Sequence, residues 1–452
     1  MSFVIYDLTF LVIFTILVFV FVYTRKSNVK REGIMYLYRT KLGIKYIDYI
    51  GDNFKRTLHF LKYIVVSCGF ILMGLIVYLI GKSIYIYLAM PQITEIIKAP
   101  PIAPLIPYFP ELFGMTSYFP PFYFTYFIIA FMIVAISHEF SHGIYMRLFK
   151  IKIKSTGLAI LGPILGAFVE QDDKDMKKKK NFEQMTVLAA GTFSNLVLGI
   201  LFLIIFILYF YAMFIPSGYV FNTYAMSSIP TETITGISDY ENNLTLIQVG
   251  ENNYFLTESM KYQIEENYSE IIVLSDAPAA KSGLKGVIVG IDDYKIVDSE
   301  GLSEVLSKYK PGEEVVIKTD IEGEIRYWNL ELGTHPENNS KAYIGVATTP
   351  QQTSMATMFS PQKPSTYYLP KYDGEFVFFI YHLLFWIMLI NIFVAMFNML
   401  PLGILDGGRF FMLAITSITK SEKFAEKLFS IVTYLILFGF ALMMFIWFVR
   451  II

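Results

Sequence analysis

The sequence predicts an all-α polytopic membrane protein with about six transmembrane helices and one small inserted α+β domain outside the membrane. Three observations lead to this fold class. Hydrophobic residues make up 55% of the 452 residues and charged residues only 17%, whereas a soluble domain carries about 25% charge. Six apolar stretches are long enough to cross a bilayer. A long polar segment, 215–374, separates the fourth stretch from the fifth.

The six apolar stretches are the predicted spans, because a helix of roughly 20 apolar residues crosses the hydrocarbon core. They run 3–23, 63–90, 122–148, 185–214, 375–405 and 428–449. The first is not expected to be a cleaved signal peptide, since Met1 to Asp7 contains no Lys or Arg.

The distribution of basic residues predicts the orientation of the spans. Lysine and arginine gather in the connections 24–62, 149–184 and 406–427, so we expect these three in the cytoplasm and both chain termini outside. The sequence therefore predicts a multi-pass protein of the cell membrane. Glycosylation sequons support the outer placement of 215–374, where all three begin: Asn243, Asn267 and Asn338.

Composition argues against two other classes of protein. The net charge is −1 and the basic residues do not gather into one folded face, so nucleic acid is not an expected partner. Cys68 is the only cysteine, which rules out a disulfide scaffold within one chain.

The segment 215–374 contains a stretch, about 265–335, that reads as a small folded domain. Ile271-Ile-Val-Leu274 and Val287-Ile-Val-Gly290 predict strands, Gly301 to Lys310 has helical spacing, and an alternating strand follows the Pro311-Gly312 turn. This order resembles the PDZ domains carried by membrane and periplasmic proteases. The resemblance implies binding of a peptide or substrate ectodomain, for example by strand addition. The alternative is an outer domain without a peptide-binding role.

The strongest chemical pattern is His138-Glu-Phe-Ser-His142, near the cytoplasmic end of the third span. On a helix the two histidines lie one turn apart on one face, so both can bind one metal ion. Glu139 lies beside them and can accept a proton from a water molecule that a Zn²⁺ ion activates. Ionisable groups inside a span are costly and usually functional. The alternative is a buried polar group used only for helix packing.

A catalytic zinc site needs a third protein ligand, and Asp406 is the best candidate. It follows Asn398-Met-Leu-Pro401-Leu-Gly-Ile-Leu405 at the cytoplasmic end of the fifth span. The third and fifth spans run in the same direction, so both motifs should lie at similar depth. The histidine of the fifth span is expected at another depth, and the remaining two in aqueous regions: His382, His59 and His335. The alternative for Asp406 is a helix-end carboxylate beside Arg409.

At this point the sequence resembles the site-2 protease family of intramembrane zinc metalloproteases. The likeness rests on His-Glu-x-x-His in one span and Asn-x-x-Pro-x-x-x-Leu-Asp-Gly in a later one, and covers about 122–427. It implies that His138, His142 and Asp406 bind Zn²⁺ and that Glu139 is the general base.

The same resemblance implies further roles. Asn398 matches an asparagine that contacts the substrate backbone. Asn195 ends a Gly-x-x-x-Asn pattern, although Thr192 stands where the family has proline; close helix packing through Gly191 is the alternative. The Gly-rich stretch Gly157 to Glu170 resembles a membrane-dipping β-hairpin that holds substrate as an added strand, with a plain loop as its alternative.

These features predict four regions. The first, 1–121, is a two-span region with an outer loop. The second and fourth, 122–214 and 375–452, are the two catalytic membrane halves. The third, 215–374, is the outer insert.

The predicted function is hydrolysis of transmembrane segments of membrane-anchored proteins within the bilayer, in regulated intramembrane proteolysis. Three rivals remain. One is a membrane zinc protease with glutamate as third ligand, which would need a Glu-x-x-x-Asp motif on a later span. Another is a metal transporter, which would need further ligands across the membrane. The last is an inactive relative that binds membrane proteins through the insert.

Overall fold

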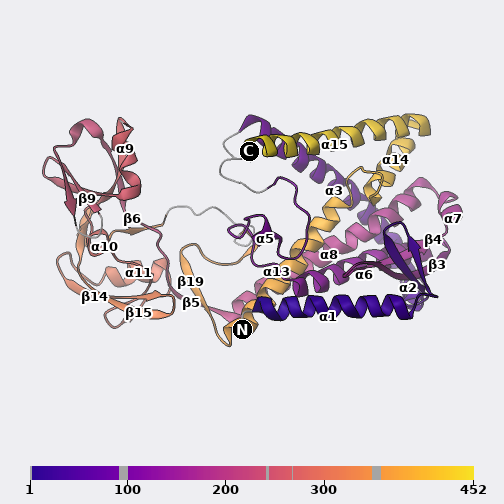
Figure 1. Cartoon of the computed structure of the whole chain (residues 1–452), viewed down its shortest axis with the longest axis horizontal. Coiled ribbons are helices and arrows are strands. Elements are labelled where there is room, and N and C mark those ends of the chain that lie inside the picture. Colours follow the sequence, from indigo (N-terminus) through magenta and orange to yellow (C-terminus); the bar gives the residue numbers. More distant parts are fainter. Residues whose placement is uncertain (1–2, 91–99, 241–243, 267, 349–357, 452) are drawn as a thin grey trace. The chain divides into compact units, whose positions relative to one another are not determined.

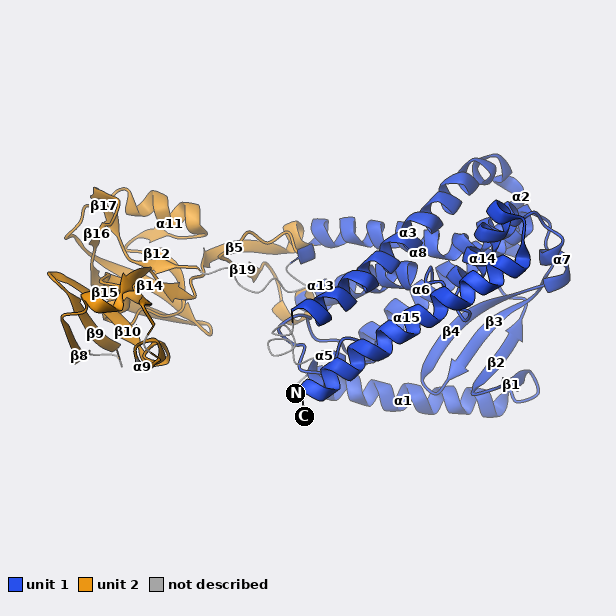
Figure 2. Cartoon of the chain, turned by 90° about the horizontal axis from the view of Figure 1, so that it is seen from above, with its two compact units in different colours: residues 1–209, 354–359, 378–452 blue, residues 210–353, 360–377 orange. Residues whose placement is uncertain are grey.

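The computed structural model describes residues 3–90, 100–240, 244–266, 268–348 and 358–451 (Figure 1). The chain forms two compact units. Unit 1 comprises Met1–Tyr209, Ser354–Phe359 and Phe378–Ile452, and unit 2 comprises Phe210–Thr353 and Ser360–Val377 (Figure 2). The sequons at Asn243 and Asn267 lie outside the described residues, whereas Asn338 is exposed at the start of a strand.

Unit 1 is built mainly from helices. Its helices are α1 (Phe3–Thr24), α2 (Ile44–Asn53), α3 (Lys55–Ala89), α5 (Phe109–Leu112), α6 (Phe124–Leu148), α7 (Asp173–Lys177), α8 (Asn181–Met213), α13 (Gly374–Phe397), α14 (Asp406–Thr419) and α15 (Glu422–Ile451), of which α8 and α13 continue into unit 2. In the described part of the chain, six of them are long and apolar enough to cross a membrane: α1, α3, α6, α8, α13 and α15. The six predicted spans are therefore confirmed as helices. Helix is expected there because lipid offers no partner for backbone N–H and C=O groups.

The end of the fifth predicted span was placed too late. Helix α13 ends at Phe397, and residues 398–405 form a non-helical link before α14 begins at Asp406. Pro401 lies in this link and cannot donate a backbone hydrogen bond to a continuing helix. The connection expected at 406–427 is mostly helical, because α14 packs its buried face, including Phe410 and Ala414, into the core of unit 1.

The prediction of an all-α membrane part is wrong for one region of unit 1, which contains a four-stranded sheet. Its strands are β1 (Val29–Glu32), β2 (Met35–Thr40), β3 (Ile153–Leu161) and β4 (Ile164–Gln171), in that order across the sheet. The hairpin expected at 157–170 is β3 and β4. The first hairpin turns at Gly33, with φ +62°, and β2 pairs with β3 over Tyr36↔Ile160 to Thr40↔Thr156. In the sequence, the charged residues around this turn resemble a loop. The second partner of β2 is β3, which lies more than 100 residues later in the chain, so no local pattern reveals the pairing.

Unit 2 is rich in strands, which form two larger sheets and two short pairs. The strands are β5 (Phe214–Tyr219), β6 (Thr223–Tyr224), β7 (Met226–Pro230), β8 (Gly236–Tyr240), β9 (Leu244–Val249), β10 (Asn252–Thr257), β11 (Glu270–Ser275), β12 (Val287–Ile291), β13 (Tyr294–Lys295), β14 (Glu314–Ile321), β15 (Glu324–Glu331), β16 (Gly333–His335), β17 (Asn338–Tyr343), β18 (Val346–Ala347) and β19 (Thr366–Pro370). One sheet has the order β7-β11-β10-β9-β8 and the other β15-β14-β12-β5-β19. In the described residues, three short α-helices and two 3-10 helices accompany them; the α-helices are α9 (Tyr262–Glu265), α10 (Pro278–Ser282) and α11 (Ser299–Leu306).

The predicted strands and helix of the insert are present as β11, β12, α11 and β14. They are divided between the two sheets, since β11 pairs with β10 whereas β12 pairs with β14. Strands from 214 to 257 complete both sheets, so the folded region extends well beyond 265–335. Alternation is weak along β5, β9 and β10, because each of them buries adjacent residues, which point to opposite faces of the sheet. The PDZ-like character of the insert stays a prediction.

Candidate metal centre

Helix α6 carries the two histidines of the predicted metal site on one inward face. His142 follows His138 by four positions, so their side chains lie one helical turn apart on the same side. They are 8% and 7% exposed, and their ring centroids are 4.6 Å apart. The helix therefore presents two buried imidazoles that can reach one ion.

Asp406 meets both histidines, although 268 residues separate it from the first. Its Oδ2 atom lies 3.1 Å from Nε2 of His138 and 3.3 Å from Nε2 of His142. Ligand atoms of a tetrahedral zinc site, with bonds of about 2.0–2.2 Å, lie about 3.3–3.5 Å apart. Both distances are close to the spacing between two ligands of one zinc ion.

The backbone of α8 closes the other side of this group at Gly191. A Cβ atom built on Gly191 would lie 2.6 Å from Nε2 of His138 and 2.6 Å from Nε2 of His142. A side chain at 191 would therefore overlap both imidazole rings, so glycine is the residue that lets α8 pack this closely against the two histidines.

The remaining ring nitrogens of both histidines contact helix α8. Nδ1 of His142 lies 2.6 Å from the carbonyl oxygen of Val187, which can only accept, so Nδ1 carries the proton and Nε2 is free to bind a metal. Nδ1 of His138 lies 3.1 Å from the side-chain amide of Asn195. Asn195 is 0% exposed and also contacts the Ser137 hydroxyl, 3.1 Å away. The structure thus places Asn195 behind the His138 ring.

Glu139 points to the sheet as well as to the histidines. Its Oε2 atom accepts a hydrogen bond from the backbone N–H of Val169 in β4, at 2.9 Å. Possible ligand atoms of His138, Glu139 and His142 all lie within 4.8 Å of one another. The carboxylate is partly exposed, so it is within reach of a water molecule beside the metal ligands.

The link between α13 and α14 places Asp406 at the first position of α14. The N–H of Gly407 donates to the carbonyl of Asn398 at 2.8 Å, which folds the link back over the helix start. A Cβ atom on Gly407 would overlap the backbone of Met399. Arg409 donates to Gln184 at 2.9 Å, so Asp406 faces the histidines and is not bound to Arg409.

The other predicted site residue, Asn398, begins the link that leads to Asp406, whereas the other histidines are not part of this group. Asn398 is partly exposed, and among the described residues no hydrogen bond of its side chain is recorded. His382 packs against the rings of Tyr126 and Tyr381. His59 lies near Phe149, and His335 belongs to unit 2.

Sequence reasoning missed two contributors to the site. Val187 acts only through its backbone carbonyl, which no side-chain pattern can reveal. Gly191 was considered only for helix packing, whereas its position against both histidines depends on how α8 crosses α6. The Gly-x-x-x-Asn pattern could have indicated that Gly191 lies at the site, because its four-residue spacing puts Gly191 and Asn195 on one face of α8.

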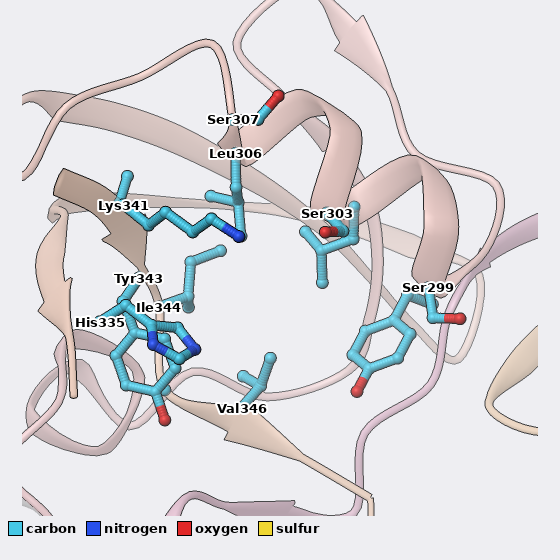
Figure 3. Close-up of a pocket in the computed structure, with 13 residues that line it drawn as sticks. Ser299, Ser303, Leu306, Ser307, His335, Lys341, Tyr343, Ile344 and Val346 are labelled. Carbon is cyan, nitrogen blue, oxygen red and sulfur yellow. The ribbon is translucent and has the colours of Figure 1, made fainter. Parts of the chain in front are cut away.

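Unit 2 contains a separate pocket of about 270 Å³ between α11 and the residues from Lys341 to Val346 (Figure 3). Its wall is largely apolar, with Leu302, Leu306 and Ile344, and its rim carries Lys341. Three serines follow one side of α11 at four-residue spacing: Ser299, Ser303 and Ser307. The pocket can hold an apolar side chain next to a negative group.

Comparisons with known proteins agree with the geometry of unit 1. A family model described as peptidase family M50 matches residues 126–444. The uncharacterized protein MJ0971 of Methanocaldococcus jannaschii is 27% identical over 198 residues, which are 42% of this chain and 48% of that protein. The match thus covers about half the length of this relative.

Proposed function

The chain belongs to peptidase family M50, the site-2 protease family, and we propose that it is an intramembrane zinc metalloprotease that cleaves transmembrane segments of membrane-anchored proteins. The observation that carries the proposal is the contact of one Asp406 oxygen with Nε2 of both His138 and His142. Regulated intramembrane proteolysis is the process in which we place it.

In the proposed mechanism His138, His142 and Asp406 would hold Zn²⁺. When bound, the ion supplies Lewis-acid chemistry, polarising a carbonyl group and lowering the pKa of water to about 7. Glu139 takes a proton from the attacking water and delivers it to the leaving amine. Val169 orients the Glu139 carboxylate through its N–H group, and Val187 and Asn195 fix the two imidazole rings.

Substrate contacts are proposed for two asparagines. Asn398 is partly exposed next to the link that carries Asp406, which supports a contact with an extended substrate backbone. Asn195 was expected to bind substrate as well. Its complete burial against His138 supports ring orientation as its main role.

The protein is a multi-pass membrane protein by its six apolar helices and its family. We propose the cell membrane as its location, with the active site toward the cytoplasm, on the basis of the basic connections 24–62 and 149–184. Lipid and membrane-spanning substrates are then its partners. No role for nucleic acid is proposed.

The insert is proposed to bind an extended segment of the substrate, as a PDZ-like domain does. The pocket beside α11 supports this role, since it joins an apolar wall with the cation of Lys341. A segment with an apolar side chain and a nearby carboxylate would complement both. Such binding would favour substrates whose outer domain has already been trimmed.

The test is Glu139→Gln in the full chain, co-expressed with a tagged single-span substrate. Cleavage should fall at least about 100-fold, because a positioned general base contributes that much or more, while the zinc content measured after purification stays unchanged. Glu422→Gln, at an exposed first-turn glutamate of α15, is the matched control and should cleave normally.

Normal cleavage by Glu139→Gln would refute the mechanism. Metal uptake into vesicles without any proteolysis by the wild type would favour the transporter instead. Among the described residues, His138, Glu139 and His142 form the only cluster of its kind, which disfavours a transport path with several metal sites.

A further inference from the structure

Asp7 is the only charged residue in helix α1, and it is buried inside unit 1 at 1% exposure. Both of its carboxylate oxygens are used. Oδ2 accepts from the backbone N–H of Phe124 at 2.7 Å and from the Tyr108 hydroxyl at 2.5 Å. Oδ1 accepts from the backbone N–H of Thr125 at 2.9 Å and from the Thr125 hydroxyl at 2.5 Å. Four donors on one carboxylate match its capacity as an acceptor.

Two of these donors are the first N–H groups of helix α6. The first turn of any helix leaves N–H groups without a partner in the helix, and a side chain just before the helix usually accepts from them. Tyr123 occupies that position and makes no such bond. Asp7 therefore supplies the missing cap from another span, at the positive end of the α6 dipole.

The other contacts between α1 and the start of α6 are apolar. Phe10 and Phe14 pack on the ring of Phe124, with centroids 5.7 and 5.5 Å apart, and Phe3 packs on Tyr123. Such contacts lack strict direction, so a helix can slide or rotate along them. The hydrogen bonds of Asp7 do have direction, and they define the rotation and depth at which α6 begins.

We propose that Asp7 is a positioning residue for the metal ligands on α6. Helix α1 then helps to set the geometry of the metal centre, although α1 precedes the residues that the family model matches. Helix α6 carries His138, Glu139 and His142, the first of them about 21 Å along the helix from Phe124 at 1.5 Å per residue. A rigid helix transmits a shift or rotation of its start to those side chains. The metal ligands on α6 thus keep their register with Asp406 partly because Asp7 holds the other end.

This inference rests on the proposed function in one respect only, which is the measurement of substrate cleavage. The experiment uses the full chain in lipid nanodiscs and compares Asp7→Ala with Thr9→Ala, which removes an exposed hydroxyl from the same helix. Three quantities are measured: hydrogen exchange of the amides at 124–127, zinc affinity by chelator competition, and kcat and KM for a single-span substrate.

In Asp7→Ala, exchange at 124–127 should rise about tenfold, as expected for loss of a helix cap. Zinc affinity and kcat should fall, with KM nearly unchanged, because the ligands lose register and the substrate contacts remain. Asp7→Asn keeps one acceptor oxygen and should lie between Asp7→Ala and the wild type. Thr9→Ala should behave as the wild type.

A cap supplied by the residue just before α6 separates positioning from simple capping. In the double variant Asp7→Ala with Tyr123→Ser, the serine can accept from the first turn, so exchange protection should return while zinc affinity and kcat stay low. Recovery of all three quantities would overturn the positioning role, as would Asp7→Ala with unchanged zinc affinity. If the wild type cleaves no substrate but the exchange and zinc effects appear, the proposed function fails and the role of Asp7 stands.

Discussion

Gly191 shows how much one residue can decide at the metal centre. Its missing side chain leaves a space bordered by Nε2 of His138 and of His142, each 2.6 Å from a hypothetical Cβ atom. In a helix interior glycine costs roughly 0.5–1 kcal/mol relative to alanine. The structure gives a reason to retain it, because the methyl group of alanine would overlap both imidazole rings.

We expect Gly191→Ala to lower zinc affinity by about 100-fold or more, at the upper end of losses seen when groups around metal ligands are altered. The metal-free protein should lose about 1–3 kcal/mol of stability, because the added methyl group would overlap both imidazole rings. Chelator competition and thermal unfolding of the purified protein measure the two quantities. Gly81→Ala, where a Cβ atom would meet nothing within 4 Å, is the control, and zinc binding equal to wild type in Gly191→Ala would contradict the assignment.

His138, Glu139 and His142 could be predicted as a group because four-residue helical spacing is a local property. Asp406 was predicted from a motif and a depth argument, and its contact with both histidines agrees with that argument. The position of Asn195 could not be derived, because which face of α8 meets α6 depends on packing between the helices.

At the scale of elements, strand β4 connects the sheet of unit 1 to the metal centre. Val169 donates to Glu139, and its neighbour Glu170 accepts from Ser155 at 2.6 Å and from Arg39 at 3.0 Å. The Ser155 hydrogen bond and the Arg39 guanidinium lower the pKa of Glu170 from its ordinary value of 4.5. These bonds tie β4 to β3 and β2, and so support the position from which Val169 reaches Glu139.

The lowered pKa predicts a pH dependence with a definite sign. A carboxylate with a depressed folded pKa stabilises the fold above the ordinary pKa, and this contribution is lost as the pH falls through the folded value. We expect amide protection in β4 to decrease below about pH 4.5 in the wild type. The effect should be under about 1 kcal/mol, because the Glu170 side chain is 35% exposed and solvent screens its interactions.

Hydrogen exchange of residues 164–171 between pH 3 and 7, corrected for intrinsic rates, checks this expectation. Glu170→Gln removes the titrating group and should abolish the acid-dependent part of the change. An equal pH dependence in Glu170→Gln would assign the effect to another carboxyl group.

The two-part path of α13 and α14 is another feature at this scale. Gly407 donates to Asn398 and has no room for a side chain, so the chain can turn at 398–405 and restart a helix at Asp406. The sequence indicated a break through Pro401 and the glycines. It did not reveal that the chain after the break would fold back into the core as a helix. That outcome depends on the distant side chains against which Phe410 packs.

At the scale of the whole molecule, the chain joins a membrane unit with a strand-rich unit that has its own cores. Ile288 and Ile317 are fully buried in one core of unit 2, and Ile247 and Val273 in another. The pocket between α11 and the residues after Lys341 belongs to unit 2 alone. A binding role there can therefore be tested separately from the metal site.

We expect Lys341→Glu to weaken binding of an extended peptide that has an apolar side chain beside a carboxylate, because the charge at the pocket rim is reversed. The loss should be about tenfold or more, since like charges replace opposite ones. Fluorescence anisotropy with the full chain and a labelled peptide measures it. Cleavage of a substrate that lacks the outer segment should not change.

Lys310→Glu makes the same charge change at an exposed lysine that does not line the pocket, and it should bind as the wild type does. Equal losses in both variants would show that only net charge matters. No binding by the wild type would refute the proposed role of the pocket.

By itself the sequence determined the six apolar helices, the pair of histidines on one helical face and the strands around 271–318, since each follows from neighbouring residues. Only the tertiary structure decided that Asp406 and Gly191 meet those histidines, that β2 extends the hairpin of β3 and β4, and that Asp7 caps α6. These relations join residues far apart in the chain, and packing between elements fixes them, which no local pattern encodes.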